Sequence, residues 1–396
     1  MPSRSDAEEL DRVDPLAEFR DEFIIPDDDL IYLDGNSLGR TPKATRARVL
    51  HVLEHEWADG LIRSWDQWLD LPRKVGNQLG PIIGSLPGEV VVHDSTTINL
   101  FQTINIALQL RPDRRVVVID AHEFPTDRFV VEGIAEQLGL EIRYLTPETQ
   151  FDDAAVIVRS VIDYRTAEMC DVAAFTETAR TAGTLVVWDL SHTAGAVEFD
   201  VHALGVELAV GCTYKFLNGG PGAPAWSFVT QHLHQAISPP IRGWFGHRDQ
   251  FAMQDGFSPH DDVRRILLGT PHILSLVAAE EGIALVNRAG MSAIASKGQA
   301  LVEFGLQVAD SFGLSTATPR DPRKRGCHLA IRHDRATDIV QTLAQHHGVI
   351  ADSRPPDIIR LGLSPLTTRF TDVWDGIENI ARLCTAEELS SRGAAE

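Results

Sequence analysis

The lysine at position 215 stands where a charged amine is costly. It follows the apolar stretch VELAVG (206–211), which is typical of a buried strand, and it precedes a segment rich in glycine and proline. Desolvation lowers the pKa of a lysine amine from its usual ~10.4, which makes the group a usable nucleophile and base. An isolated lysine in such a position more often reaches the surface or pairs with a carboxylate. The residues that accompany Lys215 must therefore decide between these interpretations.

A carboxylate and an imidazole precede this lysine in the motif WDLSHTAGA (188–196). The stretch TLVVWD (184–189) ends in Asp189, and His192 follows three residues later. A buried aspartate needs a cationic partner, because an unpaired buried charge is strongly destabilising. A pyridinium nitrogen is such a partner, and pyridoxal 5′-phosphate needs both a lysine Schiff base and a carboxylate at its ring nitrogen. Taken singly, Asp189 fits a helix N-cap and His192 a core histidine, but their combination with Lys215 favours this cofactor.

The phosphate of such a cofactor requires a cluster of hydrogen-bond donors. The stretch HDSTTINLF (93–101) places Ser95, Thr96 and Thr97 between a strand and the first turn of a helix. Unpaired backbone amides and the helix dipole favour an anion there, and a hydroxyl that caps the helix is compatible with phosphate binding. The sequence contains neither GxGxxG after a strand nor GxxxxGK[ST], which argues against nicotinamide and nucleoside-triphosphate cofactors.

Alternating apolar and helical stretches must position these groups. Nearly all-apolar runs separated by helical patterns indicate an α/β domain with a mostly parallel central sheet that is covered on both faces. Ligands bind at the carboxyl ends of the strands in such a sheet, and polar residues such as Asp94, Asp163 and Asp189 fall at those ends. The expected strands are 89–94, 115–120, 154–163, 184–189 and 206–211, and the expected helices include 96–109 and 127–138.

The pattern changes after about residue 285. A long helix is expected over 292–312, and two strands, 328–333 and 358–364, flank a helix at about 336–347. This order predicts a smaller α+β domain, against which the N-terminal segment would pack. We therefore expect a large cofactor-binding domain over residues 50–285 and a small domain built from residues 1–49 and 286–396.

Composition argues against several classes of protein. The chain has 396 residues and a net charge of −20 spread along its length, which disfavours binding to nucleic acid or to an anionic membrane surface. Its four cysteines lie far apart without CxxC spacing, so we expect reduced thiols and a cytoplasmic protein. We expect neither a membrane helix nor a signal peptide. We also expect no metal site, because His51 and His55 have ligand spacing but lack a third ligand.

Six motifs together resemble the kynureninase family, which consists of pyridoxal-phosphate hydrolases with the type I fold of aspartate aminotransferase. The motifs around His192 and Lys215 occur widely in that superfamily, whereas GNSLG joined to YKFLNGGPGAP is much more specific. The resemblance extends from about residue 31 to IIRLGLSPL (358–366), and so covers nearly the whole chain. The six motifs are LDGNSLG (33–39), EFPTD (123–127), DYRTAE (163–168), WDLSHTAGA (188–196), VGCTYKFLNGGPGAPAW (210–226) and RGWFGH (242–247).

The resemblance implies a role for each matched residue. Lys215 would form the Schiff base with pyridoxal phosphate, Asp189 would contact the pyridine nitrogen, and Tyr214 would relay a proton or bind phosphate. Phe124 would stack on the ring. Arg360 would clamp the substrate carboxylate, a task that suits the bidentate geometry of guanidinium. The resemblance implies further cofactor contacts for Thr96, Thr97, Asp127, Thr166 and His192. Trp244 and Thr270 would contact the cofactor from the other subunit of a homodimer. Asn36 and Ser37 would line the substrate side of the site.

The implied reaction is hydrolytic cleavage of the Cβ–Cγ bond of L-kynurenine or 3-hydroxy-L-kynurenine in tryptophan catabolism. Its products would be L-alanine and anthranilate or 3-hydroxyanthranilate. Two positions depart from the family pattern: Ala167 stands where a glycine is expected in DYRTAE, and His272 stands where a second proline is common in GTPH. The sequence leaves open which of the two substrates is preferred, and what the tryptophans at 57, 65 and 68 do.

Two other interpretations remain. A cysteine desulfurase or selenocysteine lyase of the same superfamily would need a nucleophilic cysteine, and Cys327 in RKRGCHLAIRH has basic neighbours that could lower its pKa. Against this, Cys327 adjoins an apolar strand and lacks a glycine- and serine-rich mobile loop. The second interpretation is a binding protein that retains the fold without turnover, but Lys215, Asp189 and Arg360 are all present, which argues against it.

Overall fold

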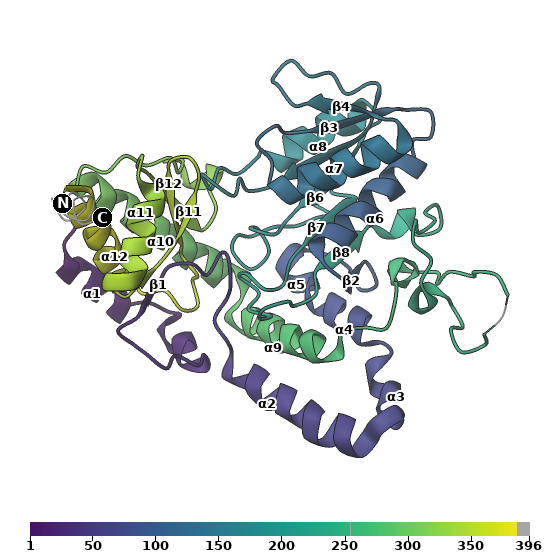
Figure 1. The fold of residues 1–396 in the computed structure, drawn as a ribbon, viewed down its shortest axis with the longest axis horizontal. Helices are drawn as coiled ribbons and strands as arrows, with labels where there is room; N and C mark the ends of the chain where they lie inside the picture. The colour runs from purple at the N-terminus through teal and green to yellow at the C-terminus, as the bar shows by residue number, and fades with distance from the viewer. Residues whose placement is uncertain (254, 386–396) are drawn as a thin grey trace, which may run out of the picture.

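The computed structural model describes residues 1–253 and 255–385, and its largest element is a seven-stranded sheet (Figure 1). The strand order is β2-β8-β7-β6-β5-β3-β4, and only β8 runs antiparallel to its neighbours. The expected α/β architecture with a mostly parallel sheet is therefore confirmed. The strands are β2 (Val90–Val92), β3 (Val116–Ile119), β4 (Glu141–Tyr144), β5 (Ala154–Ser160), β6 (Leu185–Asp189), β7 (Leu208–Gly211) and β8 (Trp226–Val229).

Both faces of this sheet are buried except at the edge strand β4, because alternate side chains of the other strands enter different hydrophobic clusters. In β3, Val116 and Val118 belong to one cluster, whereas Val117 and Ile119 belong to the other. The second cluster is completed by α6 (Thr96–Gln109) and α7 (Pro125–Leu138), and the first by α8 (Val172–Thr181) together with helices of the N-terminal half. The near-continuous apolar runs in the sequence follow from this two-sided burial.

A second, three-stranded antiparallel sheet lies in the C-terminal part of the chain. Its order is β11-β12-β9, and a separate hydrophobic cluster lies beneath it, which also includes Ala7 and Leu33 from the N-terminal segment. The N-terminal β1 (Ile31–Tyr32) pairs in parallel with β10 (Val349–Ile350), so the first and last parts of the chain lie side by side (Figure 1). The elements are β9 (His328–Arg332), β11 (Asp352–Arg354), β12 (Ile358–Gly362), α1 (Arg4–Arg12), α10 (Met291–Ser311), α11 (Ala336–His346) and α12 (Phe370–Thr385).

The remaining helices form an arm and a support beneath the large sheet. In Figure 1 the arm runs along the lower edge of the molecule through α2 and α3, and α9 lies between the arm and the small sheet. These helices are α2 (Lys43–His51), the π-helix η2 (Val52–Gly60), α3 (Trp65–Trp68), α4 (Leu71–Gln78), α5 (Gly80–Ile83) and α9 (Ile273–Ala289). Short 3₁₀ turns are η1 (Ala17–Glu22), η3 (Leu61–Ser64), η4 (Gln231–Leu233), η5 (Trp244–Gly246), η6 (Val263–Ile266) and η7 (Pro322–Lys324).

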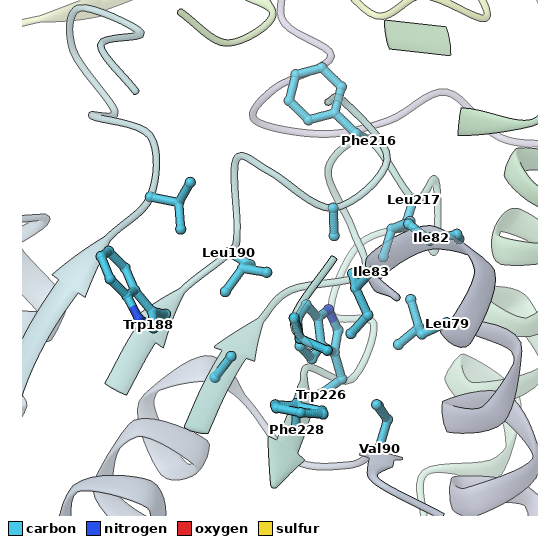
Figure 2. Packing of buried hydrophobic residues seen from close by; sticks show 14 of the residues in the cluster. Leu79, Ile82, Ile83, Val90, Trp188, Leu190, Phe216, Leu217, Trp226 and Phe228 are labelled. Carbon is cyan, nitrogen blue, oxygen red and sulfur yellow. The ribbon is translucent and has the colours of Figure 1, made fainter. Parts of the chain in front are cut away.

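The loop after Lys215 is anchored by its own apolar side chains. Phe216 and Leu217 are buried in the cluster that contains Ile82, Ile83 and Trp226 (Figure 2). On the other side, α9 approaches this loop so closely that a Cβ atom at Gly282 would clash with the Leu217 carbonyl oxygen. The position of the lysine is thus set by packing on both sides of its backbone.

We predict that Gly282→Ala destabilises the protein by about 1–3 kcal/mol, because the added methyl group must displace the loop that carries Lys215. The matched control is Gly133→Ala in α7, where nothing lies within 4 Å of the added Cβ, so helix propensity alone should stabilise by up to about 1 kcal/mol. Urea unfolding of both variants measures the difference. Equal effects of the two substitutions would contradict the close packing of α9 on the loop.

Candidate active site

A cavity of about 340 Å³ opens at the carboxyl ends of the large sheet, around Lys215. Its lining combines the end of β6, the turn after β7 and the N-terminal turns of α6 and α7. This is the place where the topology of a doubly wound sheet puts a ligand. The predicted residues in the lining are Thr96, Thr97, Phe124, Asp127, Asp189, His192, Tyr214 and Lys215.

The Lys215 amine is oriented by a neutral histidine. Lys215 Nζ lies 2.9 Å from His192 Nε2 and 6.0 Å from the centroid of the Phe124 ring. Burial lowers the pKa of His192 well below its usual range, and the positive charges of Lys215 and Arg360 add to this effect. The imidazole is therefore uncharged at neutral pH and serves as a hydrogen-bond partner of the lysine. Its Nδ1 atom is buried without a hydrogen-bond partner among the described residues.

Carboxyl groups line the same cavity as the lysine. Asp189 ends β6, and its Oδ1 accepts a hydrogen bond from the Ser191 amide at 2.6 Å, which fixes the carboxylate. Asp127 lies in the first turn of α7 and is 1% exposed. Burial raises the pKa of Asp127 well above its usual range, and the carboxyl groups of Asp189 and Glu123 raise it further. Within the described chain, Asp127 Oδ2 has no hydrogen-bond partner, so this wall leaves a buried polar atom for a ligand to contact.

The third part of the cavity is a helix N-terminus. Ser95 caps α6 and accepts a hydrogen bond from the Ile98 amide at 3.4 Å, as the sequence suggested, while Thr96 and Thr97 form the first turn. The first amides of a helix have no partners within the helix and favour an anion. Gly222, with a φ of 69°, faces the same cavity from the loop after Lys215. An anion-binding end, a flat aromatic ring and a carboxylate wall around an amine fit the parts of pyridoxal phosphate.

The predicted substrate residues form a neighbouring cluster of buried polar groups. Arg360, which is 1% exposed in β12, donates from Nη2 to Ser37 Oγ at 2.8 Å. Asn36 is fully buried. In the amide orientation that satisfies both ends of its side chain, the oxygen accepts from Arg360 Nε at 3.1 Å and the nitrogen donates to Asp34 Oδ1 at 3.3 Å. Arg360 Nη1 also donates to the carbonyl oxygen of Tyr164, at 2.7 Å. Because Tyr164 lines the cavity around Lys215, the two sites are adjacent.

Three predicted cofactor residues do not line this cavity. Thr166 donates its hydroxyl to Asp163 Oδ1 at 2.7 Å and faces a separate cavity. Trp244 is 39% exposed and packs against Phe245, with 4.7 Å between ring centroids, and Thr270 lies on the exposed segment before α9. The roles of these residues therefore stay predictions.

The tryptophans of the arm and His272 lie together outside this cavity. Trp57, Trp68 and His272 line an apolar hollow between the arm and the start of α9. Trp68 donates to Glu56 Oε2 at 2.6 Å, and Trp65 packs against Phe245 with centroids 6.1 Å apart. The unusual residue of GTPH is therefore part of the arm contact rather than of the lining around Lys215.

Sequence reasoning missed several residues that the fold brings to these sites. Ser160, the last residue of β5, and Tyr164, which follows the strand, line the cavity, a position that the rule about strand ends could have identified. Glu123 accepts from the Ser160 amide at 2.7 Å and from its hydroxyl at 2.6 Å, and is buried beside Asp127. Asp352, which pairs with Arg360, carries no motif that could have revealed it.

The proposed desulfurase nucleophile has the opposite character from the one it would need. Cys327 is 1% exposed, and its thiol contacts the Ala196 carbonyl oxygen at 3.1 Å. Burial raises the pKa of Cys327 to about 12, which contradicts the lowering that the desulfurase alternative would need. The arginine nearby, Arg325, is turned to Glu303 and to backbone oxygens instead.

Among the described residues, no helix is long and apolar enough to cross a bilayer.

Comparison with known proteins agrees with this geometry. A family model described as the kynureninase C-terminal domain matches residues 294–380. Kynureninase of Pseudomonas fluorescens is 40% identical over 400 residues, covering 97% of this chain and 96% of the relative. Kynureninase of Burkholderia pseudomallei (strain 1106a) is 41% identical over 416 residues and the full length of both chains.

Solved structures support the fold. An apo cysteine desulfurase from Thermococcus onnurineus NA1 has a TM-score of 0.77 at 18% identity and covers 98% of each chain. A C-DES variant with glycine covalently linked to its PLP cofactor has a TM-score of 0.78 at 15% identity, covering 96% of this chain and 99% of the other. These likenesses define a pyridoxal-phosphate enzyme fold of type I. At the identities reported above, the chain belongs to the kynureninase family.

The loop DYRTAE contains a strained residue that can be tested. Ala167 has a φ of 67° and is fully buried, so the position where a glycine was expected does adopt a left-handed conformation. We predict that Ala167→Gly stabilises the protein by about 1 kcal/mol, because glycine adopts this conformation without steric cost. Ala344→Gly at an exposed position of α11 should instead destabilise by about 0.5–1 kcal/mol. Urea unfolding measures both, and destabilisation by Ala167→Gly would contradict the strain.

Proposed function

We propose that this protein is a kynureninase that uses pyridoxal 5′-phosphate to hydrolyse the Cβ–Cγ bond of L-kynurenine or 3-hydroxy-L-kynurenine. The observation that carries the proposal is one cavity in which Lys215, Asp189 and Phe124 meet an anion-binding helix N-terminus, within a chain about 40% identical to kynureninases over its full length. The products would be L-alanine and anthranilate or its 3-hydroxy form.

The cavity residues divide between the parts of the cofactor. Lys215 would hold it covalently through a Schiff base, Asp189 would face the ring nitrogen with Asp127 beside it, and Phe124 would cover the ring. The first turn of α6 would bind the phosphate through Thr96 and Thr97. When bound, the cofactor supplies the electron sink that stabilises negative charge on the substrate carbons.

The chain's own residues would move the protons of the reaction. Lys215 Nζ, held 2.9 Å from a neutral His192, would take the proton from Cα of the substrate. The adjacent Cys212, burial and Asp189 together raise the pKa of the Tyr214 hydroxyl, so Tyr214 keeps its proton at neutral pH and can donate it near Cβ. The oxygen of a water molecule would add to the γ-carbonyl carbon, the Cβ–Cγ bond would break to release the aromatic acid, Cβ would take up a proton, and Lys215 would return a proton to Cα to give alanine.

We further propose that the protein is a homodimer whose sites are shared. Trp244 and Thr270 lie on exposed segments, where they are available to reach the cavity of a partner subunit. The arm adds exposed apolar side chains at Trp57, Leu61 and Ile62, which a partner could cover.

The proposed division into a large domain, 50–285, and a small domain, 1–49 with 286–396, is supported by the separate hydrophobic cluster beneath the small sheet. A cytoplasmic location is supported by the four free thiols.

The reaction is tested by incubating the holoenzyme with L-kynurenine and with 3-hydroxy-L-kynurenine in parallel. We expect one equivalent of L-alanine per aromatic product, and the ratio of kcat/KM values assigns the preferred substrate. Lys215→Ala should lower kcat by about a thousandfold or more. Cys327→Ala should leave kcat within about twofold, since the thiol is buried away from the cavity. Sulfur release from cysteine that disappears in Cys327→Ala would instead support the desulfurase.

Sharing of the site between subunits is tested by complementation. Co-expression of Lys215→Ala chains with Trp244→Ala chains forms mixed dimers, each of which holds one site with both residues intact. If the subunits assort at random, we expect about a quarter of the wild-type activity, more than either variant gives alone. A mixture that is no more active than Trp244→Ala by itself would show that Trp244 acts within its own chain.

A further inference from the structure

Asp352 takes one edge of the guanidinium that is expected to bind the substrate. Asp352 and Arg360 are direct cross-strand partners in β11 and β12. Arg360 Nε donates to Asp352 Oδ1 at 2.8 Å, and Nη2 donates to Oδ2, so the Nε–Nη2 edge already holds a bidentate carboxylate. The Arg360 side chain is almost fully buried, so water does not compete with this pair. A substrate carboxylate must therefore use the other edge.

That other edge is only partly filled. Arg360 Nη1 donates to the Tyr164 carbonyl oxygen at 2.7 Å, and Nη2 donates to Ser37 Oγ at 2.8 Å. An arginine side chain carries five N–H donors, so one N–H of Nη1 has no partner among the described residues. Tyr164, whose carbonyl oxygen accepts from Nη1, also lines the cavity around Lys215, so the free N–H and the Ser37 hydroxyl lie next to residues of that cavity.

The Ser37 hydroxyl is the group that can change its partner. It accepts from Arg360 and donates to Asp352 Oδ2 at 2.8 Å. Rotation of the O–H bond redirects the proton to a second carboxylate, while the oxygen still accepts from Arg360. Asp352 remains compensated after this change, because Arg354 Nη2 lies 2.6 Å from Oδ2. Serine can therefore act as the second donor to an incoming ligand.

We propose that Asp352 is a positioning residue that locks Arg360, so that a single carboxylate of an amino-acid substrate binds at Nη1 with the Ser37 hydroxyl as second donor. The charges match this ligand, since Arg354 and Arg360 against Asp352 leave one net positive charge. Without Asp352, the guanidinium of the buried Arg360 would lose the anchor on its Nε–Nη2 edge and would face the half-buried Arg354 with no carboxylate between them. The inference rests on the proposed function, because it takes the substrate to be an amino acid.

A second carboxyl group adjusts the charge of this cluster. Burial and the neighbouring Asp352 raise the pKa of Asp34 to about 7, against the opposing influence of Ser37 and Arg360. Asp34 adds no charge while it keeps its proton, and cancels the net positive charge once ionised, so substrate affinity should fall as the pH rises through about 7. The other titratable or charged groups around the cluster are Tyr32, Arg40, Tyr164, His192, Lys215, His328 and Arg354.

The test compares Asp352→Asn with wild-type holoenzyme. We expect the KM for kynurenine to rise about 30-fold or more, while kcat stays within about threefold, because the lost contact orients the carboxylate rather than the reacting bond. The matched control is Asp310→Asn, which removes a carboxylate from an exposed bidentate pair with Arg320 and should leave KM unchanged. A KM for Asp352→Asn within threefold of the wild-type value overturns the proposal.

Ligand binding separates this proposal from the reaction itself. Titration calorimetry of the holoenzyme with L-alanine and L-alaninamide measures the preference for a carboxylate whether or not kynurenine is turned over. Wild type should favour L-alanine, and Asp352→Asn should lose most of that preference; an unchanged preference overturns the proposal. If Asp352→Asn does not fold, Ser37→Ala carries the same comparison, with an expected loss of about five- to tenfold in L-alanine affinity.

The pH dependence provides the last arm of the test. The KM of wild type should rise as the pH passes through about 7, whereas Asp34→Asn, which cannot ionise, should lack that rise. The two enzymes differ only at residue 34, so the difference between the two profiles isolates Asp34. Identical KM profiles for wild type and Asp34→Asn would contradict the charge adjustment.

Discussion

The backbone that carries Lys215 is confined by two distant segments, and the rest of the site depends on that confinement. Gly39, at the end of GNSLG, donates its amide to the Tyr214 carbonyl oxygen at 2.8 Å, and a Cβ atom there would clash with the Lys215 carbonyl. Gly282 of α9 approaches the next residues of the same loop from another direction. The amine is therefore presented to His192, Phe124 and the carboxylates by a loop with little freedom to move, and a reactive lysine gains from such preorganisation.

Carboxyl groups outnumber cations along one wall of the cavity, and arginines outnumber carboxylates in the neighbouring cluster. Glu123, Asp127 and Asp189 lie close together. The charges of Glu123 and Asp189 raise the pKa of Asp127, whereas the positive charge of Lys215 lowers it. Asp127 is driven to keep a proton by its burial and by its neighbours, while the Ser191 amide holds Asp189 at the end of β6. The adjacent Arg360 cluster has the opposite balance, with two arginines against Asp352. One wall thus suits a cation and the neighbouring cluster an anion, as expected for an amino acid joined to a pyridine ring.

Much of the large sheet followed from the sequence, because strands buried on both faces leave nearly continuous apolar runs. β2, β3, β5, β6 and β7 all lie within expected strands. β8 was missed because its apolar run is short and lies within a motif dominated by glycine and proline, and β4 because its side chains are largely exposed. The alternative in which basic neighbours lower the pKa of Cys327 is contradicted, since neighbours in sequence say nothing about where their side chains turn.

The sequence by itself determined which residues carry chemistry at the strand ends, because a lysine and an aspartate after apolar runs are costly unless they are used. It also determined the family, through motifs spread over nearly the whole chain. Only the tertiary structure decided that Ser37, Tyr164, Asp352 and Arg360 meet, since these residues come from segments far apart in the chain. Hydrophobic periodicity reports which face of an element is buried, but the register between strands decides which charged side chains become partners.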